Sequence, residues 1–468
     1  MQYKKYLGLR LMKHLKDDKI YSPWEKTFNK FSSPFDEFLN QQTTTGLVLI
    51  FMTVVALVLA NSPLQHAYHH IFETYFVIGF GGFQINNSIH HWINDGLMAL
   101  FFFLIGLEIK REVLVGELSD IKNAILPIVA ALGGVIVPAI IFYQINMGLP
   151  SEDGWGIPMA TDIAFAVSAL VLLGRRVPVA LVVFLVALAI VDDLIAVGVI
   201  ALFYTEQINT MPLLGALAFF VVLIIFNRFG IHRPLPYFIV GVVMWVFMLE
   251  SGVHATIAGI LAAMAIPSRP SFSPEYFSDK MQKLTEKFKE HKLDEDLQLN
   301  DQQKVILHEM EMKIHNIQAP LNRMEHGLHL PISLIVIPLF ALANAGIAID
   351  FGGIGSAILE PVTLGVMLGL VIGKVVGIAG VSFIVIKLGF AKLPDGSTFS
   401  QLFGVSLLAG IGFTMSIFIA SLAWPGNAEL LLQAKIGILL ASIFAGIAGY
   451  LWLRYVAKSD PNFITKNG

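Results

Sequence analysis

Two adjacent aspartates, Asp192 and Asp193, lie in the middle of an otherwise apolar run, ALAIVDDLIAVGV. Consecutive residues of an α-helix point about 100° apart, so one carboxylate can face a cavity while the other pairs sideways. A charge at the centre of a bilayer costs about 2.5–3.5 kcal/mol on insertion scales, so charged residues in such runs are candidates for function. Two carboxylates there can hold a proton or offer oxygen ligands to a hard cation, which would compete for the same atoms. The alternative is a pair of satisfied structural carboxylates.

A third aspartate, Asp162, follows Thr161 within GWGIPMATDIAFAVSALVLLG. A proline and a polar pair in one apolar segment favour a broken helix, which a membrane tolerates only where the break lines protein or a cavity. A matching segment, LLAGIGFTMSIFIA, is interrupted by Gly410, Gly412 and Thr414. Interrupted segments at corresponding positions of two halves indicate the binding site of an inverted-repeat transporter. Close helix packing at small residues is the other interpretation of a glycine-rich span.

One lysine, Lys374, lies within the apolar run LVIGKVVGIAG. A buried lysine must find a partner or lose its charge, and an aspartate of the Asp192–Asp193 pair is the expected partner. The alternative is that the long side chain reaches the cytoplasmic interface, because the residue lies on that half of its segment.

The composition of the chain requires a membrane. Of its 468 residues, 56% are apolar and only 14% are charged, and the mean hydropathy is +0.71. Soluble domains carry about 25% charged residues, so the excess apolar surface must face lipid. Disorder, nucleic-acid binding and a secreted disulfide scaffold are poorly supported. The chain has no cysteine, which excludes disulfides and thiolate metal sites.

Twelve apolar segments are close to the ~20 residues that span a bilayer as a helix. They lie near 43–60, 95–115, 123–147, 155–174, 178–204, 210–229, 236–249, 252–267, 330–349, 358–386, 402–424 and 431–455. All 31 Lys and Arg residues except Lys374 and Lys435 fall in the two tails and in every second connection. Loops rich in Lys and Arg stay cytoplasmic, so this alternation predicts an all-α polytopic membrane protein with both termini in the cytoplasm.

The segments outside the membrane complete the predicted organisation. Residues 1–42 form a cytoplasmic tail, either solvated or with a surface-lying helix at its start, and they precede eight spans in 43–267. Residues 71–94 are rich in β-formers and glycine and predict an external hairpin, through which the chain could dimerise. Residues 268–329 form a charged, partly helical cytoplasmic insert, which four spans (330–456) and a cytoplasmic tail (457–468) follow.

At these residues the sequence resembles the bacterial NhaA family of sodium/proton antiporters. The resemblance rests on WINDGLMALFFFLIGLEIKRE (92–112), ATDIAFAVSALVLLG (160–174), VALAIVDDLIAVGVIALFY (186–204), SGVHATIAGI (251–260), IPLFALANAG (337–346), GKVVGI (373–378) and GIGFTMSIFI (410–419). These motifs occur in order through most of the membrane region. They imply an inverted-repeat antiporter fold of about twelve helices, in which two interrupted helices cross near the midplane.

The resemblance also implies roles for individual residues. Asp193 would be the principal ligand of the transported cation and of the proton, and Asp192 would share the site and exchange a salt bridge with Lys374. Asp162 and Thr161 would balance the half-helix termini. The family's cytoplasmic pH-sensing region maps onto Glu108, Arg111, Glu112, Arg323, Glu325, His326 and His329, and His254 is a further candidate.

Imidazoles titrate near neutrality, so the two histidines of that region suit pH sensing on chemistry alone, although they could also be ordinary interfacial residues. The long head and the insert depart from the compact family pattern, which leaves the pH response open.

The sequence therefore predicts a protein of the bacterial cytoplasmic (inner) membrane that exports Na⁺, and Li⁺ as well, in exchange for H⁺. We expect electrogenic, pH-regulated transport by alternating access, no cofactor, no enzymatic activity and no nucleic-acid partner. No G-x-x-x-x-G-K-[ST] motif for a nucleotide is found. An intramembrane aspartyl protease lacks its G-x-G-D element here. A coupled solute carrier would take up organic solutes, and a passive channel would move Na⁺ without protons.

Overall fold

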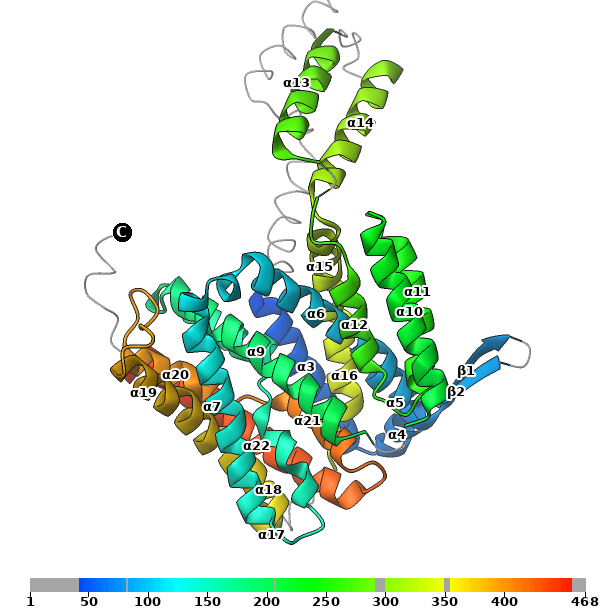
Figure 1. Ribbon diagram of the computed structural model, residues 1–468. Helices are drawn as coiled ribbons and strands as arrows, with labels where there is room; N and C mark the ends of the chain where they lie inside the picture. The colour runs from blue at the N-terminus through cyan, green and yellow to red at the C-terminus, as the bar shows by residue number, and fades with distance from the viewer. Residues whose placement is uncertain are drawn as a thin grey trace, which may run out of the picture.

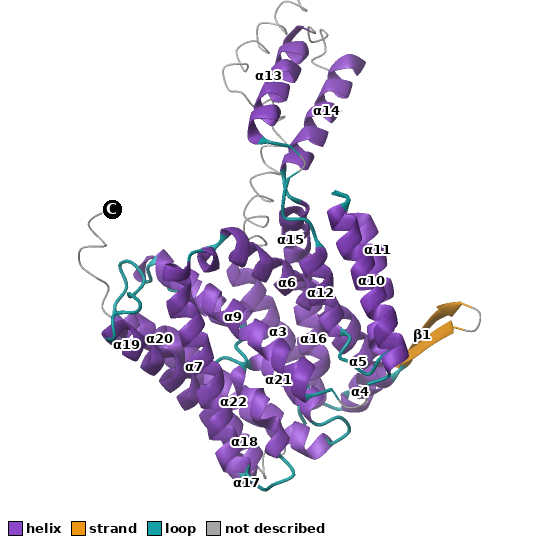
Figure 2. Cartoon of the chain, viewed as in Figure 1, coloured by secondary structure: helices purple, strands orange, loops and turns teal. Residues whose placement is uncertain are grey.

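A computed structural model of the chain describes residues 42–80, 83–205, 208–270, 272–290, 299–348 and 354–456. Almost all of the predicted N-terminal tail and the predicted C-terminal tail lie outside these residues. The described part is a helical bundle from which two hairpins project (Figures 1 and 2).

The first half of the bundle contains eight of the expected spans. Its elements are α3 (Gln42–Ala60), α4 (Gln65–Glu73), α5 (Ile89–His91), the π-helix η1 (Trp92–Leu97), α6 (Met98–Val115), the short 3-10 helix η2 (Glu117–Ser119), α7 (Ile121–Asn146), the 3-10 helix η3 (Glu152–Met159), α8 (Ile163–Val171), η4 (Gly174–Arg176), α9 (Val179–Phe203), α10 (Thr210–Arg228), α11 (Pro234–Glu250) and α12 (Thr256–Ala265).

The second half repeats the order of a long helix, a broken helix and a long helix that α7, η3–α8 and α9 show. Its elements are α15 (Pro320–Pro331), the π-helix η5 (Ile332–Val336), α16 (Ile337–Asn344), α17 (Ile354–Leu359), α18 (Pro361–Leu368), the π-helices η6 (Gly369–Gly373) and η7 (Val376–Gly380), α19 (Val381–Lys387), α20 (Phe399–Leu408), α21 (Phe413–Ala423), α22 (Ala428–Leu451) and the π-helix η8 (Trp452–Val456).

The membrane-spanning helices agree with the predicted segments. Within the described residues, seven helical segments are long and apolar enough to cross a bilayer, and two bent pairs bring that number to nine. The remaining three expected spans correspond to η1–α6, whose end is charged, and to the shorter helices α11 and α12. The all-α polytopic fold and the interruption of two spans are confirmed.

One predicted span has different bounds. The span expected at 330–349 begins at Pro320 and continues as one helical segment to Asn344. Proline occupies an N-terminal position of α15, where its missing N–H costs nothing. The first turns are polar, so hydropathy does not reveal them. The residues from Arg323 to His329 therefore extend a membrane helix instead of ending the insert.

The external hairpin is narrower than 71–94. Strands β1 (Tyr75–Phe80) and β2 (Phe83–Ser88) pair antiparallel with Ile78 opposite Ile85, whereas the flanking residues belong to α4 and to α5–η1. The helix α4 was not expected as a separate element. It turns through 113° from α3, which is consistent with a helix that lies along the membrane surface.

A second hairpin projects from the opposite end of the bundle (Figure 1). It consists of α13 (Pro274–Glu290) and α14 (Asp301–Ile317), two polar helices that pack on each other through residues such as Leu284. Asn300 and Gln303 form a capping box that starts α14. This is the partly helical insert expected from the charge pattern.

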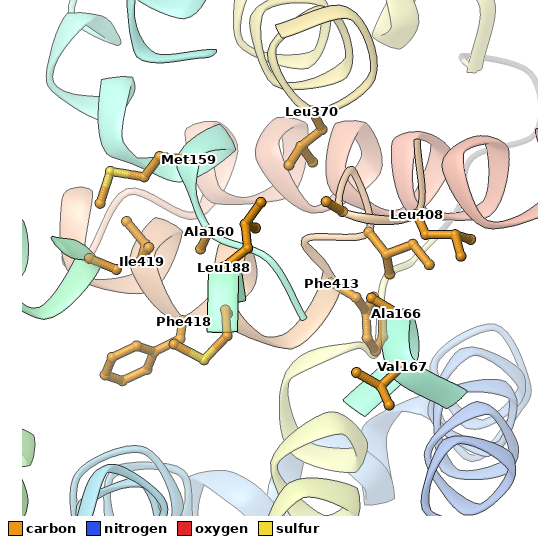
Figure 3. Close-up of a cluster of buried hydrophobic side chains, with 14 of the residues drawn as sticks. Met159, Ala160, Ala166, Val167, Leu188, Leu370, Leu408, Phe413, Phe418 and Ile419 are labelled. Carbon is orange, nitrogen blue, oxygen red and sulfur yellow. The ribbon is translucent and has the colours of Figure 1, made fainter. Parts of the chain in front are cut away.

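Close backbone contact holds the two halves together. Helix α7 packs against η6 and η7, and a Cβ on Gly377 would lie 2.1 Å from the carbonyl oxygen of Gly133. Only glycine allows such an approach, as is common between membrane helices. Around this contact lies a core of aliphatic and aromatic side chains, part of which Figure 3 shows at the breaks of the two interrupted helices.

Candidate ion-binding site

The two interrupted helices meet at their breaks. The first runs as η3 to Met159, becomes extended through Ala160 and Asp162, and resumes as α8. The second stops at Leu408, passes through Gly410 and Gly412, and resumes as α21, with a bend of 47°. The backbone N–H of Asp162 donates to the carbonyl of Ile411 at 2.7 Å, which joins one break to the other.

Asp162 caps the N-termini of both resumed helices. Its Oδ1 accepts the backbone N–H of Phe165 at 3.2 Å in α8, and its Oδ2 accepts the backbone N–H of Thr414 at 3.1 Å in α21. The hydroxyl of Thr414 donates to the same Oδ2 at 2.5 Å. Helix N-termini carry partial positive charge, so one carboxylate stabilises two such ends at once.

The C-terminal ends at the crossing receive hydrogen-bond donors. The hydroxyl of Thr161 donates to the carbonyl of Ala409 at 3.0 Å, just beyond the end of α20. The ammonium of Lys374 donates to the carbonyl of Met159, the last residue of η3. A cation at a helix C-terminus is the counterpart of a carboxylate at an N-terminus. The crossing is therefore compensated at all four ends.

Lys374 also pairs with Asp192. Its Nζ lies 2.7 Å from Oδ2 of Asp192, and both side chains are fully buried. Lys374 lies between the two π-helices η6 and η7, and such irregular turns are frequent at functional sites. Between the two alternatives for Lys374, the structure shows the buried ion pair and not a side chain that reaches the interface.

Asp193 has a different environment from its neighbour. Both of its carboxylate oxygens are buried and have no hydrogen-bond partner among the residues that the structure describes. The side chain lines a cavity of about 310 Å³, together with Asp162 and Thr414. Thus one aspartate of the pair is fixed by Lys374 and the other faces a cavity, as the 100° helical offset predicts.

The cavity continues from Asp193 toward the end of the bundle that carries α13 and α14. Its lining there includes Glu108, Arg111, Glu325 and His329. Arg111 bridges two carboxylates: its Nη2 lies 3.0 Å from Glu112 Oε1 and its Nε lies 3.0 Å from Glu325 Oε1. A network of charges therefore surrounds the mouth of the cavity.

Other predicted residues lie apart from this network. Arg323 donates to the backbone carbonyl of His232 at 2.8 Å, and His326 is exposed. His254, at the start of α12, contacts the carbonyl of Tyr204 at 2.8 Å at the other end of the bundle. Sequence reasoning placed Thr414 at a break but missed its bond to Asp162, and it missed Ser333, which lines the cavity.

The donor set at the crossing is suited to a hard cation. Carboxylate and hydroxyl oxygens of Asp193, Asp162 and Thr414 share one cavity, and oxygen is the ligand that hard cations prefer. Nowhere in the described ranges do three His, Cys, Asp or Glu side chains cluster as a resident metal site would. Buried ionisable groups between two interrupted, crossing helices define a secondary ion transporter of the inverted-repeat class.

Comparison with known proteins identifies the family. The family model described as Na+/H+ antiporter 1 matches residues 36–453. The chain is 63% identical to the Na(+)/H(+) antiporter NhaA of Sulfurimonas denitrificans, over 94% of this chain and 99% of that protein. It is 49% identical to the Na(+)/H(+) antiporter NhaA 1 of Saccharophagus degradans, over 92% and 93% of the two chains.

The chain belongs to the NhaA family of bacterial sodium/proton antiporters. It is accordingly a transporter and not an enzyme, and Na⁺ and H⁺ are its transported ions. Its location is the bacterial inner membrane, which it crosses several times.

The buried pair between Lys374 and Asp192 yields a test by double mutation. Lys374→Gln leaves a buried carboxylate without its cation, so we expect the free energy of unfolding to fall by about 3–5 kcal/mol. Combining it with Asp192→Asn removes the uncompensated charge and should restore much of the loss. Thermal unfolding of the purified protein in detergent measures both effects. Lys387→Gln, at the exposed end of the same span, is the control, and equal melting temperatures for single and double variants would contradict the pairing.

Proposed function

We propose that Asp193 is the residue at which Na⁺ and protons compete during antiport. The observation that carries this proposal is the environment of its carboxylate, which is buried without a hydrogen-bond partner in the described chain and lines a cavity. Desolvated oxygens of this kind bind either a proton or a cation. Asp192, Asp162 and Thr161 shape the site, because their polar groups support the crossing that lies beside it.

Alternating access follows from the shape of the cavity. On one side it extends to Glu108 and Glu325, and on the other side apolar rings fill the bundle. Phe418 of α21 packs against Phe102 at 5.5 Å and against Phe340 at 6.2 Å between ring centroids. A site open on one side and closed by packed rings on the other is consistent with one of the two states of the cycle, the inward-open state.

The proposed cycle exchanges cation for proton at one carboxylate. On the cytoplasmic side Asp193 loses its proton and binds Na⁺. After the crossing rearranges, protonation from outside displaces the ion. Li⁺ suits the same oxygen ligands and would be exported too. A net inward movement of positive charge in each cycle would allow the membrane potential to drive export.

We also propose that both termini are cytoplasmic. The charged hairpin α13–α14 lies at the same end of the bundle as η8, whereas β1–β2 lies at the other end (Figure 1). With the positive residues concentrated at the α13–α14 end, this arrangement is consistent with the positive-inside rule.

The central test uses everted membrane vesicles. Addition of Na⁺ should dequench a pH-sensitive dye in vesicles with the wild-type chain, and Asp193→Asn should abolish the response because an amide neither binds nor releases a proton at the pH values used. Asp279→Asn, on the exposed face of α13, is the matched control and should transport normally. Transport by Asp193→Asn would overturn the assignment, and no response to Na⁺ in the wild type would overturn antiport itself.

We propose that the charges around Arg111 regulate transport by pH. This guanidinium holds Glu112 and Glu325 together at the mouth of the cavity, so their protonation changes the contact between α6 and α15. Glu108, His326, His329, Arg323 and His254 remain candidates for the same response. His329 faces the cavity, and an imidazole there would change charge near neutral pH.

Replacing Arg111 should move the pH response. In Arg111→Gln the neighbouring carboxylates lose their common cation and repel one another, so they should release their protons at higher pH, and activation should shift alkaline by about one pH unit. Dye dequenching over a series of pH values measures the midpoint. Lys122→Gln, exposed near the start of α7, serves as control. An unchanged midpoint in Arg111→Gln would remove this network from regulation.

We propose that the chain forms a homodimer through the external hairpin. Four consecutive side chains of β1 are between 48% and 68% exposed, namely Tyr75, Phe76, Val77 and Ile78. An isolated two-stranded hairpin is marginal in stability, and its open edges accept another strand. A second copy of β1–β2 supplies both an apolar cover and the missing strand.

The absence of cysteine makes the dimer directly testable. A single cysteine at Val77 should be linked between two copies by a short bifunctional maleimide in native membranes, and the product should run as a dimer on a denaturing gel. The control is a cysteine at Met147, which is 68% exposed beyond the end of α7. Crosslinking at neither position, or to the same extent at both, would exclude the hairpin as the contact.

A further inference from the structure

A groove on the flank of the bundle reaches the crossing from the side. It has a volume of about 470 Å³ and is lined by α3, α8 and α22. Its inner residues include Ile411 and Phe413, which flank Gly412 at the break of the second interrupted helix. This groove is separate from the cavity at Asp193, because neither Asp193 nor Asp162 lines it.

The lining of the groove is suited to hydrocarbon. It is almost entirely aliphatic and aromatic, and its outer residues Val54, Ile443 and Ile447 are between 51% and 57% exposed on the apolar perimeter. Its two inner hydroxyl groups are engaged by the protein: Thr53 donates to the carbonyl of Leu49 at 2.8 Å, and Ser442 accepts the backbone N–H of Phe413 at 3.3 Å. A polar solute would find few partners here.

The groove ends at a basic site. Tyr450 and Leu451 are its last residues on α22, and Arg454 follows one turn later. The guanidinium of Arg454 donates to the hydroxyl of Tyr450 at 2.8 Å. Arg176, from the turn after α8, donates to the backbone carbonyl of Arg454 at 2.6 Å, and both arginines are exposed. Two guanidinium groups thus lie together where the hydrocarbon surface ends.

We propose that this groove binds an anionic phospholipid of the cytoplasmic leaflet. One acyl chain lies between α3, α8 and α22, and the phosphate contacts Arg454 and Arg176. Charge complementarity selects an anionic headgroup, since each Lys or Arg near the membrane surface contributes about 1 kcal/mol of attraction to anionic lipid. The occupant is a lipid and not a soluble anion, because the basic site continues directly into the apolar groove.

The lipid would act on the crossing through packing. Its chain would contact Phe413, whose ring also lies edge-on to Phe165 at 5.4 Å between centroids. Phe165 and the residue after Phe413, Thr414, are the two whose N–H groups Asp162 accepts. Occupation of the groove would therefore favour one arrangement of the break, and anionic lipid would be a regulator of the proposed transport cycle.

The binding test requires no transport. A single cysteine at Leu451, which is 46% exposed at the end of the groove, carries a bimane fluorophore in nanodiscs that contain brominated phosphatidylglycerol or brominated phosphatidylcholine. The matched control is a cysteine at Ile225, which is 42% exposed on α10 and likewise three residues before an arginine, Arg228, but does not line the groove.

We expect brominated phosphatidylglycerol at a minor mole fraction to quench the Leu451 label with roughly fivefold preference over brominated phosphatidylcholine. Arg454→Gln and Arg176→Gln should each reduce that preference, whereas Arg228→Gln should not. The Ile225 label should show no comparable preference.

Three results would overturn the proposal. They are equal quenching by the two lipids at Leu451, a preference that persists in both arginine variants, and protection of the Leu451 label from either lipid. The last would show that another segment of the chain fills the groove. Loss of transport in the Asp193→Asn variant has no bearing on this assay, so the two proposals can fail independently.

Discussion

The structure depends on the compensation of four helix ends inside a membrane. Where η3 and α20 stop and α8 and α21 begin, backbone groups lose their partners within the helices, and hydrocarbon offers no substitute. Asp162 accepts from both N-termini, and Thr161 and Lys374 donate to carbonyls at the two C-terminal ends. Charged residues at the centre of the bundle are thus required by the breaks themselves, before any ion is bound.

This compensation explains why two adjacent aspartates differ. Lys374 is held both by a helix end and by Asp192, so that carboxylate is engaged. The helical offset turns Asp193 away from the pair and into the cavity, where no protein group in the described chain satisfies it. A rigid, fully paired neighbour holds a reactive carboxylate in place, which a flexible pair could not do.

The bundle combines close packing with lateral access. Glycines at positions 133 and 377 bring α7 against η7, and Phe418 closes one side of the site. The outer groove nevertheless reaches Phe413 at the second break. Both the cavity at Asp193 and the apolar perimeter therefore contact the same few residues of the crossing, and lipid composition and ion binding would act on one element.

The sequence by itself determined the spans, the alternation of charged loops, the interruption of two helices and the presence of charges between them, because composition and periodicity report on each segment's own exposure to lipid. Resemblance to a family supplied roles for the aspartates and the lysine. Only the tertiary structure decided that Lys374 pairs with Asp192, that Thr414 donates to Asp162, and that the helix after the insert begins at Pro320. Thr414 and Asp162 are 252 positions apart, and Lys374 and Asp192 are 182 apart. Hydrogen bonds over such separations depend on how helices pack, which no local pattern encodes.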